Sequence, residues 1–167
     1  GAGARATVAN RYGVTPLSLA AATGNALVIE RLLKAGADAN TATPGGETAL
    51  MTAARTGSAA ALKALLAAGA TIDTREPRRG QTALMWAAAA GNVDGMKVLI
   101  ESGADIKARS NEVDFKKVSR AGQSGAALAA NQPAAIQFSS LAFAVRGVQL
   151  EAVKLLQDSG ADANEEL

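Results

Sequence analysis

The chain has 167 residues, of which 49% are hydrophobic and only 3% aromatic, and its formal net charge is +2. It contains no cysteine and no histidine, which excludes disulfide scaffolds, cysteine-ligated zinc sites and the most common metal ligand and general base. The small net charge requires no polyanionic partner, and no run of about 18 apolar residues predicts a membrane-spanning helix.

Residues 1–9 are interpreted as the tail of a unit that recurs later in the chain. Gly1-Ala-Gly-Ala-Arg5 aligns with Gly36-Ala-Asp-Ala-Asn40, and the sequence stops near the matching point of another unit. We therefore expect a fragment of a longer array, in which a targeting signal could lie upstream. No signal peptide is visible, so a soluble cytoplasmic protein is favoured over a secreted or periplasmic one, with the compartment undetermined.

Two short helices are predicted in residues 10–43. Thr15 is the expected N-cap of the first helix, because its hydroxyl can accept a hydrogen bond from a free amide of the first turn. Pro16 follows at the first helical position, where its missing N–H costs nothing. The second helix should place one apolar stripe inward, formed by Ile29, Leu32 and Leu33, and charged residues outward.

The same two-helix pattern is predicted in residues 44–76 and again in residues 77–108. In the latter unit Thr82 caps the first helix, Gly91 ends it in a left-handed conformation, and Asn92 caps the second helix. The apolar stripe of that second helix is predicted to contain Val93, Met96, Leu99 and Ile100.

Residues 109–136 are predicted to be an insertion between the third and fourth units. Their first part is charged and their second part is rich in small residues. Long connections in compact folds are usually either functional or disordered, and both interpretations remain open here.

A fourth, less regular unit is predicted in residues 137–167, with its first helix capped by Ser139 and a stripe of Leu150, Val153 and Leu156. Val148 stands where the earlier units have glycine, and Gln157 stands where they have Leu or Ile. We therefore expect this unit to pack less regularly or to face solvent.

The spacing between units varies, whereas the spacing within a unit does not. Thr15 to Thr48 is 33 residues, Thr48 to Thr82 is 34, and Thr82 to Ser139 is 57, but each cap lies 21 residues before the glycine that ends its second helix. The helix pair is therefore a fixed module, and the length changes fall in the turns. Neither helix can bury its apolar face alone, so the modules should stack.

These motifs resemble the ankyrin repeat family, whose pattern is Thr-Pro-Leu-His at the start of the first helix and Gly-Ala-Asp after the second. The resemblance covers nearly all of residues 10–164 apart from the insertion. It implies a single domain over residues 1–167, an all-α helix-turn-helix solenoid with outward β-turn or hairpin loops. The family's histidine is replaced in every unit, by Ser18, Met51, Met85 and Ala142.

No catalytic, cofactor-binding or metal-binding constellation is recognisable, so we expect no enzyme activity and no cofactor. The aspartates that recur once per unit fit hydrogen bonding within the turns better than acid catalysis. These are Asp38, Asp105 and Asp162.

The resemblance implies a concave groove, formed by the turns and the exposed side of the first helices, that grips a partner protein. The residues expected to line the groove differ in type from unit to unit, although the helices that carry them repeat, as expected for a scaffold whose contacts are adapted to a partner. They are Arg11, Tyr12, Val14, Glu47, Arg55, Arg78, Arg79, Gln81, Trp86, Phe138 and Arg146. The arginines could form a basic strip for an acidic partner, or they could merely keep an alanine-rich array soluble.

Several alternatives remain open at the level of sequence. Trp86 is interpreted either as a partly buried packing residue or as a stacking platform for a ligand. The leading function is a non-enzymatic, monomeric protein-binding scaffold, and the second is a structural spacer of a longer solenoid with no ligand of its own. Nucleic-acid binding would need a larger basic excess and more aromatic residues.

Overall fold

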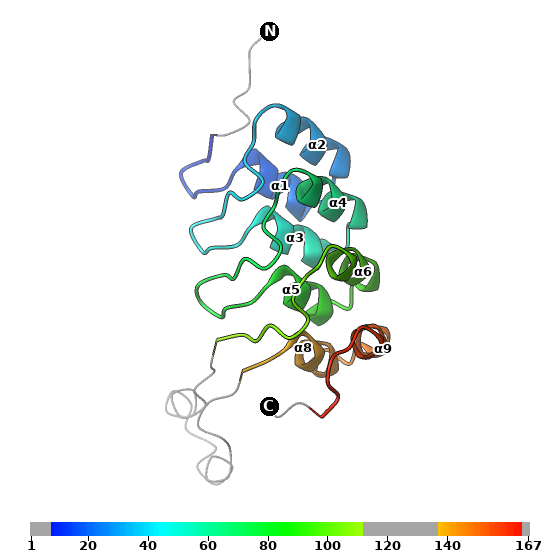
Figure 1. The fold of residues 1–167 in the computed structure, drawn as a ribbon. Helices are drawn as coiled ribbons and strands as arrows, with labels where there is room; N and C mark the ends of the chain where they lie inside the picture. Colours follow the sequence, from blue (N-terminus) through cyan, green and yellow to red (C-terminus); the bar gives the residue numbers. More distant parts are fainter. Residues whose placement is uncertain (1–7, 112–136, 165–167) are drawn as a thin grey trace, which may run out of the picture.

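The computed structural model describes residues 8–111 and 137–164, and within these ranges the chain forms eight helices in four pairs. Figure 1 shows the first helices of the pairs in one column, the second helices in another, and the turns projecting to one side. The pairs are α1 (Pro16–Ala22) with α2 (Ala26–Lys34), α3 (Ala49–Thr56) with α4 (Ala59–Ala67), α5 (Ala83–Ala89) with α6 (Val93–Glu101), and α8 (Ser140–Arg146) with α9 (Leu150–Asp158).

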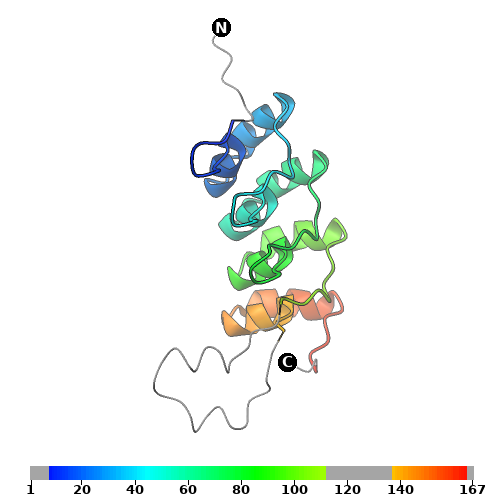
Figure 2. The same ribbon diagram turned by 90° about the vertical axis from the view of Figure 1, so that its left-hand side faces the viewer.

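The predicted all-α solenoid is confirmed. Each first helix packs on the next first helix, and each second helix on the next second helix, so the pairs follow one another along the stack (Figure 2). In the described ranges the only β-structure is two isolated bridges, Ala42 with Thr48 and Arg109 with Ser139, both at turns. We call the four helix pairs, each with the turn before it, units one to four.

The four predicted caps of the first helices are confirmed. Thr15, Thr48, Thr82 and Ser139 each accept a hydrogen bond from the backbone N–H three residues later. This bond satisfies one of the amides that a helix leaves free at its start, which is worth about 1 kcal/mol per cap.

Two of the residues that replace the family's histidine also support the cap. In unit one the Oγ of Ser18 accepts the backbone N–H of Thr15 at 3.0 Å, and in unit two the sulfur of Met51 accepts that of Thr48 at 3.5 Å. At this position of the repeat a hydroxyl therefore accepts the backbone N–H of the cap residue in one unit and a thioether accepts it in another.

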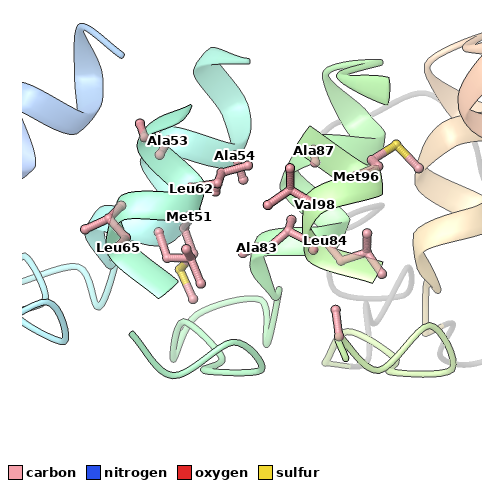
Figure 3. Close-up of a cluster of buried hydrophobic side chains, with 14 of the residues drawn as sticks. Met51, Ala53, Ala54, Leu62, Leu65, Ala83, Leu84, Ala87, Met96 and Val98 are labelled. Atoms are coloured by element: carbon pink, nitrogen blue, oxygen red, sulfur yellow. The ribbon is translucent and has the colours of Figure 1, made fainter. Parts of the chain in front are cut away.

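The interior between units is made of small and aliphatic side chains. Figure 3 shows the contact between units two and three, where Met51, Ala54 and Leu62 lie opposite Ala83 and Ala87. All five are at most 1% exposed. Alanine recurs at one buried position of every first helix, which allows the helix backbones to approach closely. These alanines are Ala20, Ala53, Ala87 and Ala144.

Side-chain hydrogen bonds join successive units at the turns between their two helices. The Oγ of Ser58 donates to the carbonyl of Gly24 at 2.8 Å, and the Nδ2 of Asn92 donates to the carbonyl of Ala54 at 2.7 Å. Gln149 occupies the matching place in unit four; its side chain caps no amide of α9, and it forms no hydrogen bond with unit three among the described residues. The joint between units three and four therefore lacks a bond that the other two joints have.

The recurring aspartates act within the turns, as predicted. Asp38, Asp105 and Asp162 each accept the backbone N–H of the second residue after them, at 2.9 Å in all three units. Their carboxylates therefore order the outward loops.

One prediction for unit four is wrong. Leu150, placed in the inward stripe, is 63% exposed, whereas Leu156 is fully buried and Val153 half-buried. Val145 is likewise 58% exposed, although the matching Ala21 and its counterparts in units two and three are buried. Both residues lie on the side of unit four that no other described unit covers.

Most of the predicted insertion, residues 112–136, lies outside the described residues, so its two interpretations remain untested. Its first residues continue the stack. The backbone N–H of Ser110 donates to the carbonyl of Phe138 at 2.9 Å, and the N–H of Asn111 donates to the carbonyl of Arg79 at 2.7 Å. Residues 110 and 138 therefore lie side by side at the turn of unit four.

Candidate functional site

The turn at residues 76–81 presents two arginines on an ordered backbone. Glu76 is only 5% exposed, and its carboxylate accepts the backbone N–H groups of Arg78 at 2.8 Å, Arg79 at 2.7 Å and Gln81 at 3.3 Å. The backbone also closes on itself, since the N–H of Gly80 donates to the carbonyl of Glu76 at 2.9 Å. The side chains of Arg78 and Arg79 remain exposed. The hydrogen bonds therefore fix the backbone of both arginines and leave their guanidinium groups accessible.

Two further arginines occupy equivalent positions on the first helices. Arg55 lies in the last turn of α3 and Arg146 in the last turn of α8, where a positive charge interacts favourably with the helix dipole. Ala89 holds the same place in α5, between them in the stack. Its small side chain leaves the space between the two arginines open.

A pocket of about 490 Å³ lies over α5, between the end of α3 and the end of α8. Its lining combines three arginines with two aromatic rings and contains no carboxylate. The lining residues are Arg55, Arg79, Gln81, Met85, Trp86, Ala89, Ala90, Phe143, Arg146 and Gly147. We call this the α5–α8 pocket; it draws on units two, three and four.

Aromatic rings support the arginines at both ends of the α5–α8 pocket. The guanidinium carbon of Arg55 lies 5.2 Å from the centroid of the Trp86 ring, and that of Arg146 lies 6.0 Å from the centroid of Phe138. The ring of Phe138 in turn packs on Phe143, with centroids 5.7 Å apart and planes inclined by 52°. Such contacts contribute about 0.5–1 kcal/mol at exposed sites and restrict where the guanidinium groups lie.

Trp86 is both a packing residue and a wall of the pocket. Its side chain is half-buried, and its indole Nε1 is inaccessible to solvent and has no hydrogen-bond acceptor among the described residues. Leaving a buried N–H unpaired costs about 1–3 kcal/mol. The two interpretations of Trp86 are therefore compatible: part of the ring packs against the stack and part faces the pocket.

A family model described as ankyrin repeats, in three copies, matches residues 17–110. The match spans more than half of the 167 residues.

The chain belongs to the ankyrin repeat family.

Ankyrin repeats are generally protein–protein interaction modules and are typically non-enzymatic. No curated protein matches the chain. The family match ends before α8 and α9, which continue the ankyrin stack in the structure.

Other kinds of site find no support in the part of the chain that the structure describes. No group of three or more acidic, histidine or cysteine side chains in residues 8–111 and 137–164 is arranged to hold a metal ion. Across the same residues, no helix has the length and apolarity needed to cross a membrane.

The ankyrin stack brings together some of the predicted groove residues and not others. Those that line the α5–α8 pocket are Arg55, Arg79, Gln81, Trp86 and Arg146. Phe138 lies beside it, in contact with the ring of Phe143 and under Arg146.

The remaining predicted residues lie outside the pocket. Arg11, Tyr12 and Val14 precede α1, where the Arg11 guanidinium lies 4.7 Å from the Tyr12 ring centroid. Glu47 precedes α3, and Arg78 lies on the 76–81 turn but does not line the pocket. Their role in binding stays a prediction.

The sequence-based prediction missed Phe143 and Met85 as pocket residues. Phe143 has the same position in its unit as Trp86, four residues after the cap, so the register of the repeat contained the signal. Met85 was considered only as a replacement for the family's histidine. It is almost fully buried and forms the floor of the pocket rather than a free surface.

Proposed function

We propose that this ankyrin domain is a non-enzymatic module that binds an extended or loop segment of a partner protein, one carrying acidic groups. The segment would lie in the groove along the first helices and the turns that precede them. The proposal goes beyond the general role of ankyrin repeats by naming a surface and a charge preference.

The observation that carries the proposal is the unpaired positive charge of this surface. Arg55, Arg79 and Arg146 are exposed, and none of them forms an ion pair with another residue of the described ranges. Arginine and aromatic side chains are also those most often found at binding hot spots. A segment with carboxylates supplies the charges that the surface lacks.

The test compares two triple variants with the same charge change. Short random peptides are selected on the unmodified protein, and their affinities are measured for a groove variant, R55E/R78E/R79E, and for a control variant, R31E/K63E/K97E. The control residues are exposed and lie on the second helices α2, α4 and α6. We expect the groove variant to lose the selected peptides and the control variant to retain them.

Two results would contradict the proposal. One is an equal loss of binding in both variants, which would indicate a general effect of net charge. The other is a selection that yields no binding peptide, together with a parent protein that keeps its partners when these units are replaced by consensus units. That second result would favour a structural spacer.

A further inference from the structure

The three arginines of the α5–α8 pocket belong to three different units. Arg55 comes from α3, Arg79 from the 76–81 turn and Arg146 from α8. Because the three guanidinium groups come from separate elements along the stack, a segment that runs along the groove can meet each with a separate side chain. The distribution of charge therefore fits an extended chain with several single charges.

The floor between the charged ends is apolar. Trp86 and Phe143 occupy the same register on neighbouring first helices, and the buried Met85 also lines the pocket. Aromatic walls of this kind accept a large apolar side chain and contribute affinity at low entropic cost. The pocket thus presents two chemistries in a fixed order along the stack: charge, apolar surface, charge.

We propose that the α5–α8 pocket selects segments in which acidic residues flank a large apolar residue. The apolar side chain occupies the space over Trp86 and Phe143, and the flanking carboxylates pair with Arg55 and Arg146. Arg79 and Gln81 at the rim interact with the backbone or with a further carboxylate. This inference rests on the proposed binding of a protein segment in the groove and specifies which segments it takes.

Trp86 provides a direct readout because it is the only tryptophan of the chain. Short random peptides without tryptophan are selected on the full chain, and each enriched peptide is titrated while the emission of Trp86 is recorded. We expect enrichment of acidic residues on both sides of a large apolar residue. We also expect a blue shift of Trp86 emission, since the bound side chain removes water from the indole.

Substitutions then separate the pocket from the rest of the groove. R55Q and R146Q should each weaken the enriched peptides about tenfold, because each removes one charge-assisted hydrogen bond. R31Q is the matched control; Arg31 is an exposed arginine of α2, outside the pocket, and should leave affinity unchanged. R55E should recover binding to a peptide in which the facing glutamate is replaced by lysine.

The outcomes distinguish this inference from the proposed function. Peptides that are lost with R55E/R78E/R79E but keep their affinity for R55Q and R146Q would leave groove binding standing and overturn the selectivity of the pocket. Enriched acidic peptides in which the acidic residues do not flank a large apolar residue would do the same. Tighter binding of an oligothymidylate of about a dozen nucleotides, with quenching of Trp86, would instead indicate a single-stranded nucleic acid and overturn both.

Discussion

Among the residues that the structure describes, Val148 is the one non-glycine residue with a positive φ. Its φ is 56°, the left-handed region that disfavours branched side chains, and the side chain is 88% exposed. Units one to three have glycine at this position, also with positive φ: Gly24, Gly57 and Gly91. Because the exposed side chain makes little contact with the stack, burial does not offset the strain.

Replacing Val148 by glycine should therefore stabilise the protein. A left-handed conformation costs a non-glycine residue about 1–2 kcal/mol, which the substitution removes. Glycine has a larger conformational entropy in the unfolded chain, and this reduces the gain in stability by about 0.5–1 kcal/mol. We expect the free energy of unfolding of V148G to rise by about 0.5–1 kcal/mol in urea titrations. V148A keeps a Cβ in the strained conformation, so it should gain less; a larger gain for V148A would contradict this explanation.

At the scale of elements, the 76–81 turn depends on one buried carboxylate. Three backbone N–H groups converge on the two oxygens of Glu76, which is how a short turn without a regular hydrogen-bond pattern remains ordered. The turn in unit two has no such residue: Glu47 is half-exposed, and its carboxylate has no hydrogen bond with a described residue.

The substitution E76Q should loosen this turn. An amide offers one acceptor oxygen and turns an NH₂ group toward the backbone donors, so at least one of these part-buried N–H groups loses its partner, at a cost of about 1 kcal/mol. We expect a lower free energy of unfolding and faster hydrogen exchange at the amides of Arg78, Arg79 and Gln81. E47Q is the control and should change neither; equal effects of the two substitutions would show that the buried carboxylate has no special role.

The helices and their caps could be predicted from the sequence because each depends on local chemistry repeated in register. The threonine or serine before each first helix and the glycine after each second helix recur at a fixed spacing, so a few residues indicate where the helices begin and end. The role of Glu76 could not be predicted, since it depends on the path of the backbone through the turn. Phe143 was missed as a pocket residue for the same reason. The repeat gives Phe143 the same position in its unit as Trp86, but only the packing of α8 on α5 brings both rings to one pocket.

The exposure of Leu150 was missed for a different reason. Its predicted burial rested on helical periodicity, which shows which residues share a face. Whether that face is covered depends on a neighbouring unit, and no other described unit covers this side of unit four.

At the scale of the whole molecule, stability depends on contacts between neighbouring units. Leu62 is fully buried between units two and three, and the main helix contacts join only successive units. In such an array a weakened unit also weakens the neighbours that pack on it. Among the described residues, unit one packs on unit two alone.

The substitution L62A should therefore affect more than its own unit. Truncating a buried leucine costs about 2–5 kcal/mol, and we expect hydrogen exchange to accelerate in α1 and α2 as well as in α3 and α4, with α8 and α9 least affected. L27A is the matched control, because Leu27 is 62% exposed and its truncation should change stability by no more than about 0.5 kcal/mol. Uniform acceleration along the whole stack would show that the array unfolds as one cooperative block.

The side chain of Gln149 has a mechanical consequence at the joint between units three and four. Ser58 and Asn92 each donate a side-chain hydrogen bond to the preceding unit, whereas the described residues hold no such bond from Gln149, so we expect α8 and α9 to tilt more readily than the other helix pairs. Arg55 lies on α3 and Arg146 on α8, so such a tilt would change the distance between their guanidinium groups. We expect a ligand that contacts both guanidinium groups to hold α8 in one position relative to α3 and so to make the packing of unit four on unit three more rigid.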